Sequence, residues 1–313
     1  MAQIKPRTQV PSPKTQVPSP KTPVLITHPE KIMFPDDGIT KGDLATYYET
    51  VAPLMLPHVQ GRPITMERYP AGIGKKGFWQ KSVEKGFPTW LQRVDVPKTD
   101  GVVHHPVITD ARSLMWLVNQ NTITCHVWTS RVPELYYPDL CVFDLDPSSH
   151  DPAPVRAAAI GLRDRLEKLG LPSWVKTSGS KGYHIVVPLD GKANMDEVVR
   201  FANQVGRLLV SHAPDHLTQE FSKADRKGRI YVDTGRNGYS ATFAAAYTVR
   251  AKPGAPVSAP CTWEEVEHGK ANPDTFTIRT MPARIKKTGD IWADLLRSRR
   301  SLKAATEKLE RLL

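Results

Sequence analysis

The pattern of hydrophobic and polar positions predicts interleaved helices and strands from residue 24 onward. Apolar side chains that recur every three or four residues predict helices, because one face of such a segment can be buried. The expected helices span residues 41–56, 110–119, 155–169, 195–211 and 292–313. Short apolar or alternating runs bounded by turn residues predict strands. The expected strands span residues 102–108, 122–128, 140–145, 174–176, 185–187, 229–233 and 241–250.

This order of elements indicates an α/β (α+β) fold, because strands and helices are interleaved along the chain. Hairpin-like stretches are frequent, which favours mixed or antiparallel sheets flanked by helices over a doubly wound parallel sheet. Residues 62–98 are rich in Gly, Pro, Lys and aromatic residues, and we expect strands there that are joined by a long exposed loop. With 313 residues, the chain is long enough to bury a sizeable core.

The first 23 residues differ from the rest in composition. The heptad TQVPSPK at residues 8–14 recurs at residues 15–21, and an altered third copy begins at Thr22. Proline fixes φ and removes a backbone donor, so we expect residues 1–23 to form a disordered Pro-rich basic arm. Residues 24–313 are then expected to form the folded domain. The arm is either a linker without a role or a tether that contacts DNA or a protein.

Composition adds a charge bias to this picture. Lys and Arg number 43 against 32 Asp and Glu, a formal net charge of +11, which favours polyanionic partners such as nucleic acid. No apolar run approaches the roughly 18 residues of a membrane span, and no signal peptide is recognisable, so we expect no membrane partner and no secretion. The widely spaced Cys125, Cys141 and Cys261 indicate neither a disulfide framework nor a zinc site, which favours a reducing, cytoplasmic setting.

A pair of aspartates, Asp144 and Asp146, closes the apolar strand expected at residues 140–145. Because side chains alternate along a strand, both carboxylates point to one face, while Phe143 and Leu145 point to the other. Two carboxylates this close repel each other unless a divalent cation lies between them, and oxygen ligands suit Mg²⁺ or Mn²⁺. Alternatively, the pair only caps the strand before a turn.

A Gly-rich loop precedes the strand expected at residues 185–187. Its glycines allow backbone amides to converge on an anion, and Ser178, Ser180 and Lys181 add two hydroxyls and a positive charge. The loop opens a strand, whereas a Walker A loop opens a helix, so the sequence predicts a hairpin-type phosphate cradle. Alternatively, it is a turn with a surface lysine.

A third acidic residue, Asp233, ends the strand expected at residues 229–233. Ile230 and Val232 alternate with it, so its carboxylate is free to face Asp144 and Asp146. Three carboxylates without Cys or His ligands fit a two-metal site for phosphoryl transfer.

Basic residues surround this third acid. Lys223, Arg226 and Arg250 would neutralise a nucleoside triphosphate. In the alternative interpretation, the basic cluster is a solvated face, and Asp233 pairs with Arg236 in a turn.

Two smaller features have a structural and a functional interpretation. His126 lies on an expected strand and either packs there or donates a hydrogen bond to a phosphate. Phe78 and Trp79, with lysines on both sides, combine a stacking surface with positive charge, as nucleic-acid grooves do. A regular strand would bury one of these two rings, so we expect both to be free for stacking only in a loop.

Together these motifs resemble the polymerase domain of bacterial ligase D, a family of the archaeo-eukaryotic primase superfamily. The resemblance covers residues 24–300 and includes matching segments around residues 256–258 and 263–265. Its ordered motifs are FDLDP at 143–147, SGSKGYH at 178–184, and Asp233 followed by Arg236–Asn237 and YTVR at 247–250. It implies a primase-polymerase fold for residues 24–313 and templated nucleotidyl transfer that prefers ribonucleotides.

The resemblance also implies roles for single residues. It makes Asp144, Asp146 and Asp233 catalytic and the ligands of two Mn²⁺ or Mg²⁺ ions. The residues that it places around the incoming nucleotide are His126, Ser178, Lys181, His184, Arg226 and Arg250. The residues that it places on DNA are Lys31 and Lys41, at a 5′-phosphate, and Phe78 and Trp79, at a template base. Relatives commonly have two phenylalanines at this last pair, so Trp79 alters that contact.

The resulting hypothesis is a DNA-directed nucleotidyltransferase that fills short gaps or extends ends in DNA repair such as non-homologous end joining. Its expected partners are nucleoside triphosphates, DNA with gaps or ends that carry a 5′-phosphate, and a Ku-type end-binding protein. We expect a cytoplasmic, nucleoid-associated enzyme. No ligase or nuclease module is recognisable, so we also expect a stand-alone polymerase that works with a separate DNA ligase.

Two other function classes remain open at this point. A phosphatase of the haloacid dehalogenase type also begins with an apolar strand and D-x-D, although Ser148 departs from its usual Thr or Val. A non-catalytic DNA-end-binding protein would explain the positive charge but not three converging aspartates.

Overall fold

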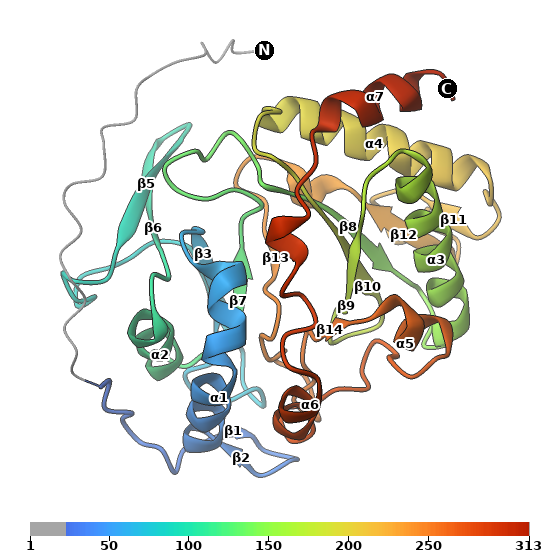
Figure 1. The fold of residues 1–313 in the computed structure, drawn as a ribbon. Helices are drawn as coiled ribbons and strands as arrows, with labels where there is room; N and C mark the ends of the chain where they lie inside the picture. The colour runs from blue at the N-terminus through green and yellow to red at the C-terminus, as the bar shows by residue number, and fades with distance from the viewer. Residues whose placement is uncertain (1–22, 313) are drawn as a thin grey trace.

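The computed structural model describes residues 23–312, in which two main sheets carry most of the strands (Figure 1). The expected Pro-rich arm lies outside the described residues, except for Pro23. The six-stranded sheet has the order β11 (Leu217–Thr218), β12 (Ile230–Asp233), β8 (Leu140–Asp146), β10 (Tyr183–Pro188), β9 (Trp174–Thr177) and β14 (Pro260–Cys261). The four-stranded sheet has the order β13 (Phe243–Ala244), β7 (Thr122–Val127), β3 (Ile64–Arg68) and β4 (Phe78–Gln80).

Nearly all strand pairs are antiparallel, and only β11 pairs with β12 in parallel. Two small hairpins complete the strands that the structure describes. They are β1 (Ile32–Phe34) with β2 (Ile39–Thr40), and β5 (Arg93–Lys98) with β6 (Gly101–Pro106). The expectation of a mixed or antiparallel α/β (α+β) fold is therefore confirmed.

The helices pack on the two sheets or on one another. They are α1 (Lys41–Val59), α2 (Ala111–Asn119), α3 (Pro152–Lys168), α4 (Met195–Ser211), α5 (Trp263–Glu267), α6 (Met281–Thr288) and α7 (Leu302–Glu310), with short 3₁₀ turns at Gly235–Asn237 and Leu295–Arg297. Helices α3 and α4 pack on β8 and its neighbours, and α2 packs on β7 and against α1. One face of each sheet is thus left to meet the other sheet.

Local sequence explains where several of these helices begin. Thr40 and Asp43 form a capping box at the start of α1, in which each side chain accepts a hydrogen bond from the other residue's backbone amide. Asp110 and Ser113 form the same box at α2. Helix α4 coincides with the expected residues 195–211, because a continuous stripe of buried apolar side chains follows its capping residue Asn194.

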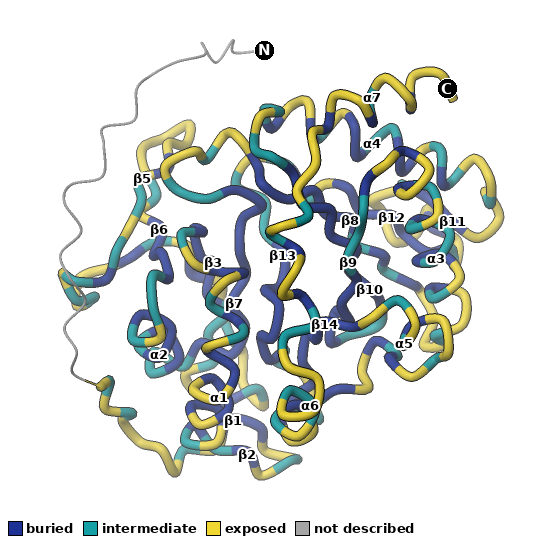
Figure 2. The backbone as a smooth tube through the Cα atoms, viewed as in Figure 1, coloured by how far each residue is buried: buried dark blue, intermediate teal, exposed yellow. Residues whose placement is uncertain are grey.

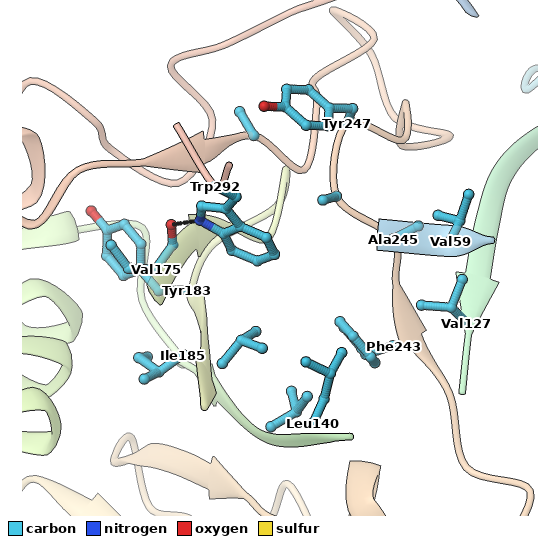
Figure 3. Packing of buried hydrophobic residues seen from close by; sticks show 14 of the residues in the cluster. Val59, Val127, Leu140, Val175, Tyr183, Ile185, Phe243, Ala245, Tyr247 and Trp292 are labelled. Atoms are coloured by element: carbon cyan, nitrogen blue, oxygen red, sulfur yellow. Dashed lines mark hydrogen bonds between the residues drawn. The ribbon is translucent and has the colours of Figure 1, made fainter. Parts of the chain in front are cut away.

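The hydrophobic core is continuous across the interior of the molecule, where Figure 2 shows the central strands buried. Between the sheets, Val127, Leu140 and Phe243 pack near Trp292, whose indole Nε1 donates to the Val175 carbonyl at 3.2 Å (Figure 3). The three cysteines are buried free thiols. Across residues 23–312, no helix has the length and apolar character needed to cross a bilayer.

Two expectations about elements are wrong. Residues 241–250 were expected to form one strand, yet only β13 is regular, because Tyr247 has φ of 66° and turns the chain toward the segment around residue 258. Residues 292–313 were expected to be helical, yet only a 3₁₀ turn and α7 form within 292–312. The segment between them runs extended, and Arg300 there exchanges backbone hydrogen bonds with Pro188 and Asp190.

Candidate active site

Three carboxylates meet on the inner face of the six-stranded sheet. Asp144 and Asp146 lie on β8, where they are partly exposed. Phe143, before them, and Leu145, between them, are fully buried. Asp233 ends β12 and is the register partner of Asp144 in the antiparallel β12–β8 pair. Directly opposed residues of an antiparallel pair point to the same face. The structure thus brings the three aspartates together, as the strand alternation predicts.

Arginines already neutralise part of this negative charge. Arg236, in the 3₁₀ turn after β12, reaches both Asp144 Oδ2, at 3.2 Å from Nε, and Asp233 Oδ2, at 3.0 Å from Nη2. Arg226 Nη1 lies 3.0 Å from Asp146 Oδ2. The turn pairing of Asp233 with Arg236, considered above as an alternative to a role at the site, therefore coexists with the convergence of the aspartates.

The aspartates of this cluster differ in how easily they lose a proton. Burial pushes the pKa of Asp144 up, but His184, Arg236 and Lys176 outweigh it and hold this pKa well below its usual value. Burial raises the pKa of Asp233, and the neighbouring Asp144 raises it further, which Arg236 only partly offsets. Asp144 is therefore ionised across the physiological range, and Asp233 takes up a proton at a higher pH than Asp144.

The Gly-rich loop forms the hairpin between β9 and β10, beside Asp144. Ser178 Oγ accepts hydrogen bonds from the backbone amides of Ser180 (3.2 Å) and Gly182 (3.1 Å). A side chain at Gly182 would place its Cβ 1.7 Å from the Leu145 carbonyl oxygen, so only glycine lets the hairpin approach β8. The predicted cradle is thus packed directly against the strand that carries the aspartates.

Arg250 approaches the same hairpin from the segment after β13. Its Nη1 donates to the Ser178 carbonyl at 2.7 Å, and its Nε is a buried donor without a hydrogen-bond partner among the described residues. A buried guanidinium nitrogen without an acceptor is costly, and a phosphate oxygen would satisfy it. Lys181 lies in the loop itself, and Lys252 contacts the Ser180 hydroxyl. The predicted nucleotide-binding residues of this region therefore form one basic surface.

His126 faces this surface from β7 of the other sheet. It is nearly fully buried, and burial lowers its pKa to about 4, so the ring is neutral. Its Nε2 lies 3.2 Å from Glu67 Oε2, and Tyr69 donates to the other Glu67 oxygen at 3.0 Å. The sequence analysis missed Glu67, because an acid on a strand gives no signal until its neighbours are known.

Phe78 and Trp79 are both exposed although they lie on a strand. Their exposed fractions are 44% and 57%, because β4 is the edge strand of its sheet. The expectation that a strand would bury one of the two is therefore wrong. Trp79 packs on the His126 ring at 4.3 Å between centroids, and Arg68 lies over Phe78 at 5.3 Å. Both rings retain free surface for stacking.

Lys31 and Lys41 lie together at the β1–β2 hairpin, where the Lys41 backbone amide donates to the Lys31 carbonyl at 2.7 Å. Lys41 is buried, and its Nζ donates to the Thr27 carbonyl at 2.8 Å. Burial lowers the pKa of Lys41, and the positive charge of Lys31 lowers it further. Two lysines that repel each other form a place where an anion is favoured.

The donor set of the three aspartates fits a divalent cation of the Mg²⁺ or Mn²⁺ type, which prefers carboxylate oxygens. Within residues 23–312, no three acidic, His or Cys side chains are arranged as a ready-made coordination shell. Arg236 explains this arrangement, because its guanidinium lies between Asp144 and Asp233. Its side chain is 41% exposed, against 9% for Arg226, so it is the more accessible of the two arginines.

Comparison with known proteins gives concordant matches. Residues 40–292 match the family described as the LigD primase-polymerase domain. The multifunctional non-homologous end joining DNA repair protein LigD of Mycobacterium tuberculosis is 34% identical over 253 residues, which are 78% of this chain and 33% of that protein. LigD of Pseudomonas aeruginosa is 33% identical over 294 residues, which are 91% of this chain and 34% of that protein.

The fold matches the solved polymerase domain from Mycobacterium tuberculosis ligase D in complex with DNA. The TM-score is 0.83 at 31% sequence identity, and the match covers 88% of this chain and 99% of that domain. This chain spans about a third of the length of the curated relatives named above.

Proposed function

The chain belongs to the LigD primase-polymerase family, and on that premise we propose that it is a metal-dependent nucleotidyltransferase that copies a DNA template during double-strand-break repair. It would fill short gaps or extend ends in non-homologous end joining. The observation that carries the proposal is the convergence of Asp144, Asp146 and Asp233 beside the Ser178 hairpin. Family membership also argues against the phosphatase alternative.

The three aspartates would hold two Mn²⁺ or Mg²⁺ ions, which lower the pKa of a primer 3′-hydroxyl and neutralise the departing pyrophosphate. The chain itself contributes position and charge. Asp144 is held ionised by its neighbours, so it is ready to act as a ligand at neutral pH. Arg226 and Arg236 keep the carboxylates apart and oriented while no other cation is bound.

The incoming nucleoside triphosphate would lie against the hairpin. Arg250, with its unpartnered Nε, and Lys181 would bind phosphate oxygens, and the Ser178 hydroxyl group already orders the backbone amides around that point. His126 and His184 flank this position from the two sheets. The preference for ribonucleotides rests on the family resemblance, and either Mn²⁺ or Mg²⁺ fits the carboxylate ligands.

The DNA would contact the other end of the site. Trp79, next to His126, and Phe78, under Arg68, present exposed rings on which a template base would stack. The Lys31–Lys41 pair would bind the 5′-phosphate on the downstream strand of a gap. Such a substrate implies a nucleoid-associated location in the cytoplasm, and cooperation with a DNA ligase and a Ku-type end-binding protein.

Primer extension on a gapped, 5′-phosphorylated duplex tests the proposal. The wild type is expected to add nucleotides, and Asp146→Asn to slow incorporation by about 1000-fold, because roughly 4 kcal/mol of charge stabilisation is lost. Asp164→Asn is the matched control, because Asp164 has a side-chain exposure of 49% and an arginine partner at 3.0 Å, against 48% and 3.0 Å for Asp146.

Comparing ribo- with deoxyribonucleotides, and Mn²⁺ with Mg²⁺, in the same assay measures the two finer preferences. Undiminished synthesis by Asp146→Asn would refute the assignment of the aspartates. A wild type that binds the duplex but never extends the primer would instead support the non-catalytic DNA-end-binding alternative.

A further inference from the structure

A buried lysine lies behind the carboxylate cluster, and the proposed reaction gives it no contact with metal, nucleotide or DNA. Lys176, on β9, has no exposed surface, and the aromatic ring of Phe243 lies 5.7 Å from its Nζ. Its polar contacts are His184 Nδ1, at 2.7 Å, and the Ser258 hydroxyl group. No described carboxylate forms an ion pair with it. Burying an ammonium group costs free energy that a methionine or leucine of similar size would avoid.

The hydrogen bonds around Lys176 have only one consistent direction. Ser258 Oγ donates its proton to the Thr177 carbonyl at 3.0 Å, so it accepts from Lys176. A lysine nitrogen that donates to Ser258 keeps a further N–H for His184 Nδ1 whether it is an ammonium or an amine group. A neutral His184 whose Nε2 donates to the Asp144 carboxylate must accept at Nδ1. The chain of donors therefore runs from Lys176 to His184.

His184 in turn donates a hydrogen bond to the carboxylate cluster. With Nδ1 accepting from Lys176, the neutral ring carries its proton on Nε2, which lies 3.3 Å from Asp144 Oδ1. The Asp144 carboxylate can only accept, so the tautomer suits it. Asp144 Oδ1 is then occupied by His184, while Oδ2 faces Arg236 at 3.2 Å. The Asp144 carboxylate is thus held between His184 on Oδ1 and Arg236 on Oδ2.

We propose that Lys176 is a positioning residue that, by donating to His184 Nδ1, fixes the histidine tautomer that orients Asp144 for cation binding. The proposal rests on the function proposed above only in taking Asp144 as a metal ligand. Groups that orient a ligating side chain from behind the first shell commonly contribute 10–100-fold to metal affinity. The burial of Lys176 is explained on this basis, since an apolar side chain has no proton to donate to the ring.

Two substitutions of similar shape distinguish hydrogen-bond donation by Lys176 from its contribution to packing. Lys176→Gln and Lys176→Met have side chains of equal length, and both remove the positive charge, but only glutamine keeps an N–H donor. We expect Lys176→Met to weaken Mn²⁺ binding by about 10–100-fold and Lys176→Gln to remain close to the wild type. Mn²⁺ titration followed by electron paramagnetic resonance, without nucleotide or DNA, measures this affinity directly.

The tautomer of His184 is read independently of any metal. In ¹⁵N-histidine-labelled wild type, assigned by the signal missing in His184→Asn, we expect a protonated Nε2 and an Nδ1 that accepts a hydrogen bond. The Nδ1 resonance should stay in place in Lys176→Gln and shift in Lys176→Met.

Three results would overturn the proposal: a wild-type His184 protonated on Nδ1, an Nδ1 resonance unchanged in Lys176→Met, or equal loss of Mn²⁺ affinity in both variants. The wild-type spectrum decides the first of these even if neither variant folds. A wild type that binds no Mn²⁺ would instead contradict the proposed function, because the tautomer is measured without metal.

Discussion

Strand β8 has an arginine–carboxylate cluster at each end, and the two clusters have opposite charge ratios. The Asp139 cluster precedes the strand: Arg62, Arg131 and Arg299 all contact the single carboxylate of Asp139, at 2.6, 2.8 and 3.3 Å. At the other end, the three aspartates of the candidate active site face two guanidinium groups, those of Arg226 and Arg236.

This difference in charge ratio separates a structural cluster from a binding site. At Asp139, excess positive charge surrounds one acid, and Arg62 is fully buried with its Nε donating to the His58 carbonyl at 2.9 Å. Arg62 precedes the four-stranded sheet and Asp139 the six-stranded sheet, so the cluster joins the two sheets. At the aspartates, three carboxylates contact two guanidinium groups, and Asp146 is half exposed. The ratio of carboxylates to arginines therefore favours a cation there and not at Asp139.

Removing the Asp139 carboxylate is expected to have the largest effect on stability. Asp139→Asn leaves the buried Arg62 without its counter-charge and should lower the free energy of unfolding by about 3–5 kcal/mol. Asp146→Asn should change it by less than about 1 kcal/mol, because that carboxylate is half exposed. Urea denaturation followed by circular dichroism measures both. Equal destabilisation by the two substitutions would contradict the distinction between the clusters.

The Lys31–Lys41 pair extends the comparison to a site of positive charge that has no ion-paired acid within residues 23–312. Loss of one charged hydrogen bond to a phosphate should weaken binding about tenfold. We therefore expect Lys31→Gln to bind a gapped duplex with a 5′-phosphate about tenfold less tightly, and the same gap without the phosphate nearly unchanged. Fluorescence anisotropy at fixed salt measures both affinities, with Lys303→Gln on α7 as a control. An equal loss of affinity for the two duplexes would contradict the assignment of Lys31 and Lys41 to the 5′-phosphate.

The smallest expected effect is a difference between the pH at which the aspartates lose Mn²⁺ and the pH at which the Asp139 cluster loses its stabilising charge. The pKa of Asp233 lies above the ordinary value of 3.8, so falling pH protonates it before Asp144 and weakens Mn²⁺ binding. Burial pushes the pKa of Asp139 up, but Arg62 and Arg131 outweigh it and hold this pKa below 3.8. A carboxylate whose pKa is depressed by folding stabilises the fold at any pH above its unfolded-state pKa. This stabilisation disappears only when the pH falls below its folded-state pKa.

Mn²⁺ binding should therefore be lost at a higher pH than the fold. Mn²⁺ titration and circular dichroism on the same samples, from neutral pH downward, measure the two transitions. Asp233→Asn is the control, because its residual Mn²⁺ affinity should lack this pH dependence. Joint loss of binding and fold at one pH would show that the clusters do not titrate separately.

Much of this architecture was predictable from local pattern. The amphipathic stripe of α4, the capping residues of α1 and α2, and the short apolar run of β8 each contain their own signal. Residues 241–250 and 292–312 were mispredicted, because their backbone groups form hydrogen bonds with distant loops. Such contacts produce no periodic pattern of hydrophobic residues in the sequence. Periodicity reports which face is buried and says nothing of irregular segments that are held by tertiary hydrogen bonds.

The sequence by itself determined the chemical identity of the site: three aspartates on two strands, a hairpin loop with serines and a lysine, and arginines nearby. Side-chain alternation in strands is a local rule, so the shared face of Asp144 and Asp146 followed from spacing alone. Only the tertiary structure decided that Arg236 lies between Asp144 and Asp233, and that Lys176 is buried behind His184. Those contacts depend on the pairing of β12, β8, β10 and β9, and strand pairing is fixed by the packing of the whole core.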